Sequence, residues 1–130
     1  MSRRIFSCSA TWKDRKFQKD FAGLSPQAQE EFLRELLALN AWLEKTPHPA
    51  TDPQLRQAYR AKSYKGVVVL RSGNLIEYSL GNLARVIAKY PAREGSGDIL
   101  LIAVTLSHDH ERLKRLIKSN RSEIDDWDGE

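Results

Sequence analysis

Two neighbouring stretches decide the fold: LARVIAKY at residues 83–90 and ILLIAVTL at residues 99–106. Both are rich in β-branched and other apolar residues, which is typical of strands buried in a sheet. Cations interrupt the first stretch at Arg85 and Lys89, and the second leads directly into SHDH at 107–110. The sequence therefore predicts two core strands with cationic and proton-active side chains beside them.

The N-terminal part predicts a short strand and two helices. Residues 4–10 are strand-like, and 12–21 carry apolar residues at helical spacing. Ser25 and Pro26 begin the strongest helix, because serine can cap the first amides and proline in the first turn costs no hydrogen bond. The apolar stripe of this helix, including two leucines that widen it, consists of Phe32, Leu33, Leu36, Leu37, Leu39 and Leu43.

Around the core strands the pattern predicts a β meander and a closing helix. Residues 67–70 and 75–80 are strand-like, and 111–119 form a basic helix. The fold class is therefore α+β: an N-terminal strand and a two-helix hairpin on one face of an antiparallel sheet of about four strands, with a short C-terminal helix. The other face of this sheet is expected to be open.

Composition indicates one soluble domain. The chain has 130 residues, with 41% hydrophobic and 29% charged, which fits a single α+β domain at 1–119 followed by an acidic tail at 120–130. It has no long apolar run at its start and none of membrane-spanning length, so we expect no signal peptide and no membrane segment. The lone Cys8 cannot form an internal disulfide, so we expect a buried, inert thiol and a cytoplasmic location.

Positive charge gathers in two blocks of a chain with net charge +4. Such blocks can bind an anionic polymer such as RNA or DNA, and the alternative is a solvated surface. The acidic tail either shields a basic groove or frays. The blocks consist of Arg56, Arg60, Lys62, Lys65 and Arg71, and of Arg112, Lys114, Arg115, Lys118 and Arg121.

Strand periodicity places Arg85 and Lys89 on one face. Alternate residues of a strand share a face, and the opposite set in 83–90 is apolar enough to face the core. We therefore expect both cations to line the open face of the sheet. A guanidinium there can hold a phosphate in a bidentate way. The alternative for Arg85 is a salt bridge to Glu77 on the neighbouring strand.

His108 and His110 directly follow the last strand. Histidine titrates near neutral pH and suits proton transfer. Asp109 can cap the next helix, and in the alternative interpretation His110 is a surface helix residue and His108 a packing residue. No third spaced ligand accompanies them, so we expect no metal and no cofactor. The residue types present therefore leave two kinds of function: nucleic-acid binding, or acid–base chemistry on a phosphodiester by Arg, Lys and His side chains.

Four segments together resemble the RelE/ParE superfamily of bacterial type II toxins: KSYKG at 62–66, IEYSLGNLARVI at 76–87, ILLIAV at 99–104 and SHD at 107–109. The resemblance covers about residues 5–117. It implies a two-helix hairpin packed on an antiparallel sheet. In ribosome-dependent members of that family, dispersed Arg, Lys, His or Tyr residues cleave mRNA in the ribosomal A site.

The resemblance assigns roles to residues of this chain. Arg85 matches the family's arginine in the penultimate strand, and His108 falls where some members place a histidine. We hypothesise an mRNA-cleaving toxin that inhibits translation, with RNA, the ribosome and a small antitoxin as partners. The alternatives are a ParE-like toxin that binds DNA gyrase and a nucleic-acid-binding accessory domain. The expected catalytic residues are Arg85, His108 and His110, and the expected RNA-binding residues are Lys62, Lys65, Arg71 and Lys89.

Overall fold

The computed structural model describes residues 4–9, 11–63, 74–81, 84–90, 98–106 and 109–127. The predicted strand at 67–70 lies outside these ranges. In the described part of the chain, no helix is both long enough and apolar enough to cross a bilayer. The elements are β1 (Ile5–Ser7), α1 (Arg15–Ala22), α2 (Pro26–Lys45), α3 (Pro53–Ala58), β2 (Lys62–Ser63), β3 (Asn74–Leu80), β4 (Ala84–Tyr90), β5 (Ile99–Thr105), α4 (His110–Ser119) and α5 (Arg121–Asp126).

One mixed sheet organises the molecule, with its strands in the order β1-β5-β4-β3-β2. β2, β3, β4 and β5 pair antiparallel, whereas β1 runs parallel to β5. The two stretches 83–90 and 99–106 supply the central strands β4 and β5, which are buried along their whole length. The predicted α+β class is confirmed, with five described strands in place of about four.

The predicted helix starts are confirmed by their caps. The Ser25 hydroxyl accepts a hydrogen bond from the Ala28 amide at 3.2 Å, and Pro26 occupies the first helical position. Asp109 caps α4 by accepting from the Arg112 amide at 3.1 Å. Local chemistry alone fixes both starts, because each cap satisfies an amide that the helix itself leaves without a partner.

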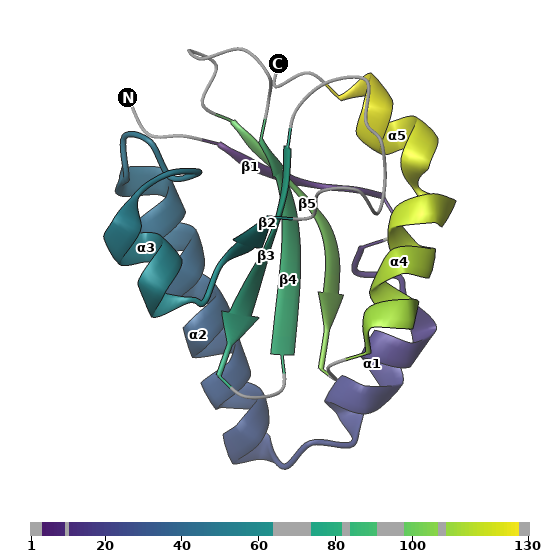
Figure 1. Ribbon diagram of the computed structural model, residues 1–130. Helices are drawn as coiled ribbons and strands as arrows, with labels where there is room; N and C mark the ends of the chain where they lie inside the picture. Colours follow the sequence, from purple (N-terminus) through teal and green to yellow (C-terminus); the bar gives the residue numbers. More distant parts are fainter. Residues whose placement is uncertain are drawn as a thin grey trace.

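Helices cover both faces of the sheet (Figure 1). We call the face under α2 and α3 the first face and the face under α4 and α5 the second face. The first face carries a core of aliphatic and aromatic residues that includes Leu39, Leu43 and Val86. On the second face, Ile87 packs with Ile124 and with leucine and isoleucine side chains of α4. The expectation of an open second face was therefore wrong, since α4 and α5 bury apolar area there.

Two segments differ from the sequence expectation. Leu33 and Leu37, expected to widen the buried stripe of α2, are exposed because only one side of the helix reaches the sheet. The acidic segment beyond residue 120 contains α5, whose Ile124 is fully buried. Ile124 joins the apolar cluster of the second face, so this acidic segment packs against the sheet.

Candidate functional site

The second face carries the buried polar side chains of the sheet. Cross-strand pairing and strand alternation place them there, on the same side as Ile87, whereas the first face holds apolar residues and the phenols of Tyr78 and Tyr90, which bond to each other. Burying polar groups costs free energy unless they find partners, so their gathering on one face needs an explanation. Among the described strand residues they are Glu77, Ser79, Arg85, Lys89 and Thr105.

Three of these residues form a row across the sheet. Ser79 on β3 pairs with Arg85 on β4, which pairs with Thr105 on β5. Directly paired residues share a face and lie about 4.5–5.5 Å apart at Cβ. We call Ser79, Arg85 and Thr105 the polar row. Figure 1 shows that β3 and β5 end, and β4 begins, at the end of the sheet where α4 starts.

Arg85 is the charged centre of the polar row. It is 7% exposed, and its Nη1 donates a hydrogen bond to the Ala84 carbonyl at 2.9 Å. Within the described part of the chain it has no ion pair, so the alternative of a salt bridge to Glu77 is not realised. A guanidinium has five N–H donors in a planar fork. Arg85 therefore retains donors that suit an anion, with a hydroxyl on either side.

The start of α4 lies beside the polar row in sequence and in space. Thr105 ends β5, and α4 begins five residues later with the exposed His110. An ion pair between Arg112 and Asp14 fixes the first turn of α4 against the start of α1. His110 is thus held at the same end of the sheet as Arg85. His108 falls outside the described residues, so its role stays a prediction.

Lys62 lies at the edge of the sheet, one row away from Arg85. It pairs with Glu77, which pairs with Ile87, so Lys62 and Glu77 share the second face. Lys62 is exposed, whereas Glu77 is 1% exposed. An exposed ammonium on an edge strand can reach a polyanion that approaches the second face. Lys65 and Arg71, the other predicted RNA-binding cations, lie outside the described residues.

Lys89 shares the strand and the face of Arg85 but not its environment. It is 0% exposed, and its ammonium donates to the carbonyls of Ile124 at 2.5 Å and Trp127 at 2.8 Å. The ammonium also lies 5.9 Å from the centre of the Trp127 ring. The open face expected for Lys89 does not exist, because α5 covers it. Lys89 therefore holds the C-terminal segment and does not reach a ligand at the surface.

Cys8 is buried, as predicted. Burial, reinforced by the nearby Glu123 carboxylate, raises the pKa of its thiol to about 12, with Lys89 opposing the shift. A thiol is a nucleophile only as thiolate, so Cys8 is inert near neutral pH. Among the described residues, no three His, Cys, Asp or Glu side chains gather into a group that could hold a metal ion.

Comparison of the chain with protein-family models, curated proteins and solved structures finds no match. The chemistry of the site itself is therefore what bears on function.

The sequence interpretation missed Ser79 and Thr105 as neighbours of Arg85. Alternation along 75–80 puts Ser79 on the same face as Glu77, and Thr105 is the single hydroxyl in the apolar stretch 99–106. These signals were present, but the strand pairing that brings the two hydroxyls to either side of Arg85 is a tertiary property. The register between strands is what the sequence alone did not supply.

Proposed function

We propose that this chain is the toxin of a type II toxin–antitoxin pair, an endoribonuclease of RelE type that cleaves mRNA and so inhibits translation. The observation that carries the proposal is the polar row: Arg85, with one hydrogen bond to a carbonyl and no ion pair in the described chain, flanked by two hydroxyls. An arginine so placed matches the arginine of the penultimate strand that the sequence resemblance pointed to. The start of α4, with His110, lies at the same end.

In this proposal Arg85 binds the scissile phosphate. Its guanidinium donates to the non-bridging oxygens and stabilises the extra negative charge of the phosphorane. On the second face, RNA can approach only the end of the sheet that carries Arg85, because α5 covers the region around Lys89. RNA therefore meets the molecule where β4 begins, with Lys62 contacting the backbone from the edge strand. Lys65 and Arg71 are proposed to extend that contact.

The proton transfers are assigned to histidine. A base accepts the proton of the 2′-hydroxyl as that oxygen attacks phosphorus, and an acid donates a proton to the departing 5′-oxygen. The products are a 2′,3′-cyclic phosphate and a free 5′-hydroxyl. His108 is the first candidate and His110 the second, since they are the neighbours in sequence of Asp109, the residue that caps α4.

The proposed partners follow from the same surface. The ribosome would present the mRNA, and a small antitoxin protein would cover the cationic end of the second face until the toxin is released. A partner segment rich in acidic residues suits Lys62 and the exposed Arg115 and Lys118 of α4.

Induction of the protein in bacteria, followed by mapping of mRNA 5′ ends, tests the proposal. We expect growth arrest together with new 5′-hydroxyl ends inside coding regions. A culture arrested to the same degree by a translation inhibitor is the matched control, because arrest alone alters mRNA decay. Halted growth with unbroken mRNA would contradict the nuclease, and an accompanying DNA-damage response would favour a gyrase-binding toxin.

A further inference from the structure

The net positive charge of the chain lies on two of its helices. Residues 13–22 and 109–119, which contain α1 and α4, together hold eight Lys or Arg residues and four Asp or Glu residues. This excess of four equals the net charge of +4 of the whole chain. A local excess of one sign attracts a ligand of the opposite sign. The basic blocks of the sequence included the cations of α4 but not those of α1.

The acidic side chains of these two segments already have partners. Three ion pairs and one helix cap occupy them: Asp20 with Lys16 at 3.1 Å, Glu111 with Lys114 at 3.6 Å, Asp14 with Arg112, and Asp109 as the cap of α4. Five other cations of the same segments are exposed, and none of them forms an ion pair within the described chain. We call them the α1–α4 cations: Lys13, Arg15, Lys19, Arg115 and Lys118.

One ion pair holds the starts of the two helices together. Asp14 directly precedes α1 and Arg112 lies in the first turn of α4, and their side chains are 13% and 15% exposed. Figure 1 shows α1 beside the first turn of α4. Lys13 and Arg15 flank Asp14 in the chain, and Arg115 lies one turn after Arg112. Cations from both helices therefore gather around one fixed junction.

This junction and Lys62 lie on opposite sides of the polar row. The Thr11 hydroxyl donates to the Ile102 carbonyl of β5 at 3.0 Å, so the chain approaches α1 along the edge of β5. Thr105, at the end of β5, is the member of the polar row nearest this edge. Lys62 lies on β2 at the other edge of the sheet, and β4 with Arg85 lies between the two edges.

We propose that the α1–α4 cations bind the phosphate backbone of RNA on the side of Arg85 opposite to Lys62. The inference rests on the proposed function and names its substrate as an RNA strand that continues on both sides of the scissile phosphate. Neighbouring strands are about 4.8 Å apart, so β2 with Lys62 lies about 10 Å to one side of β4. The acidic antitoxin segment proposed for Arg115 and Lys118 would occupy the same surface and exclude RNA.

The chemistry of the α1–α4 cations favours a polyanion. A single exposed cation binds a single anion weakly, because water and salt screen the attraction. Several cations along one polyanion act together, because each phosphate contact releases condensed counterions. Contacts with phosphates carry no sequence information. Binding by this surface is therefore expected to be independent of RNA sequence and to weaken steeply with salt.

Fluorescence anisotropy of a labelled RNA of mixed sequence, about 20 nucleotides long, tests the proposal. The parent protein is the full chain with Arg85→Ala, so that the RNA stays intact, and Kd is measured at several NaCl concentrations. Adding Arg15→Gln and Arg115→Gln removes one cation from each helix. The slope of log K against log[NaCl] is expected to become shallower by about 1.4, since each contact with a single strand contributes about 0.7, and Kd at about 100 mM NaCl to rise about tenfold.

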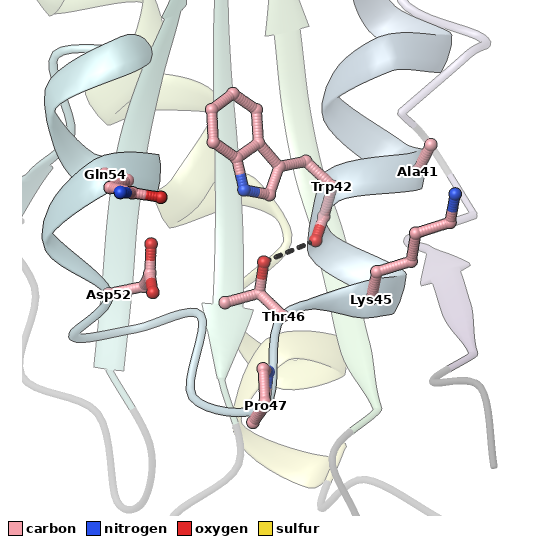
Figure 2. A pocket seen from close by; sticks show the side chains of 7 residues that line it. All are labelled: Ala41, Trp42, Lys45, Thr46, Pro47, Asp52 and Gln54. Atoms are coloured by element: carbon pink, nitrogen blue, oxygen red, sulfur yellow. Dashed lines mark hydrogen bonds between the residues drawn. The ribbon is translucent and has the colours of Figure 1, made fainter.

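The matched control is Arg34→Gln with Lys45→Gln, which removes the same charge from α2 on the first face. Both side chains are exposed, and neither forms an ion pair within the described chain. Figure 2 shows Lys45 at the end of α2 with its side chain directed away from Asp52 and Gln54. This control is expected to bind RNA as tightly as the parent. Thermal melting of each purified variant checks that it is folded.

Three results would overturn the proposal. They are a parent that does not bind RNA, an unchanged affinity after removal of Arg15 and Arg115, and an equal loss of affinity in the control, which would follow net charge and not this surface. Single-stranded DNA of the same sequence bound more than tenfold tighter would assign the surface to DNA. Failure of the proposed function looks different: RNA bound through the α1–α4 cations, with mRNA left unbroken in cells by wild type, would refute the nuclease and keep this surface.

Discussion

Arg85 and Lys89 lie on the same strand and the same face, yet the two ends of that face differ completely. At one end α5 closes over Lys89, and main-chain carbonyls of Ile124 and Trp127 accept the hydrogen bonds of its ammonium. At the other end Arg85 is paired with Ser79 on one neighbouring strand and Thr105 on the other, and its guanidinium donates a hydrogen bond to the Ala84 carbonyl.

Strand periodicity therefore assigns a residue to a face of the sheet but does not assign its role. A buried cation whose donors meet carbonyls stabilises structure, since both groups would otherwise lie buried without a partner. A cation that retains donors at the end of a sheet can bind a ligand. Lys89 therefore belongs to the fold, and we propose that Arg85 belongs to the function. Substitutions that separate the effect on stability from the effect on activity test the contrast between these two positions.

The largest expected effect is on stability at Lys89. Lys89→Ala removes two hydrogen bonds and the packed side-chain stem, and leaves two buried carbonyls without a donor. We expect the free energy of unfolding to fall by about 3 kcal/mol, measured by urea denaturation. Lys89→Met retains most of the side-chain stem, so its free energy of unfolding is expected to fall by about 1 kcal/mol less than that of Lys89→Ala. A change below about 1 kcal/mol for Lys89→Ala would show that α5 does not depend on this ammonium.

Next in size is the effect of Arg85 on cleavage. Arg85→Ala is expected to reduce the rate of mRNA cleavage about 100-fold, because it removes the group that stabilises the phosphorane. Arg34→Ala, which removes an exposed arginine on α2 far from the second face, is the matched control. Equal cleavage by wild type and Arg85→Ala, measured as counts of new 5′ ends at equal protein levels, would remove Arg85 from the site.

A smaller expected effect is the pH dependence of stability that the Cys8 thiol, packed in the cluster that includes Ile124 of α5, gives to the protein. Its pKa is raised by burial from 9.0 to about 12, so the neutral thiol is favoured in the folded protein. Stability linked to this group is complete below about pH 9 and declines above it by about 1.4 kcal/mol per pH unit until about pH 12. Because the thiol of the unfolded chain is only half ionised at pH 9, wild type should lose about 1 kcal/mol more than Cys8→Ala between pH 9 and pH 10. Parallel declines would contradict the burial of this thiol.

The smallest expected effect concerns two exposed hydrogen bonds between Ser9 and Glu123 of α5. The Ser9 amide and hydroxyl donate to the two carboxylate oxygens of Glu123 at 2.8 and 2.9 Å. Solvent weakens such a contact, so Ser9→Ala should cost about 0.5–1 kcal/mol in urea denaturation. If the free energy of unfolding fell as much as it does in Lys89→Ala, the hydrogen bonds between Ser9 and Glu123, and not Lys89, would be what holds α5 on the sheet.

Much of this fold follows from local signals in the sequence. Ser25, Pro26 and Asp109 fix helix starts through caps, and the two core strands follow from their apolar runs. The cover over the second face was not foreseen, because α5 is acidic and its attachment depends on Ile124 and on Lys89, 35 residues earlier in the chain. Local propensity carries no information about such a distant contact.

The candidate site, like the fold, combines features that follow from the local sequence with features that depend on distant contacts. Residue type and strand alternation singled out Arg85, but its hydroxyl neighbours come from strand register. The role of Lys89 was misjudged for a related reason: charge on a strand was read as charge facing solvent, although a lysine can be buried when carbonyls satisfy its ammonium. For His108, Lys65 and Arg71 the sequence remains the basis of the prediction.

The most direct test of the contrast compares Arg85→Ala with Lys89→Met in one experiment. Each variant is induced in bacteria at the same protein level, mRNA 5′ ends are mapped, and the melting temperature of the purified protein is measured. The account predicts intact mRNA with a near-normal melting temperature for Arg85→Ala, and cleaved mRNA with a lowered melting temperature for Lys89→Met. Cleavage by the folded Arg85→Ala variant, or intact mRNA with the folded Lys89→Met variant, would contradict it.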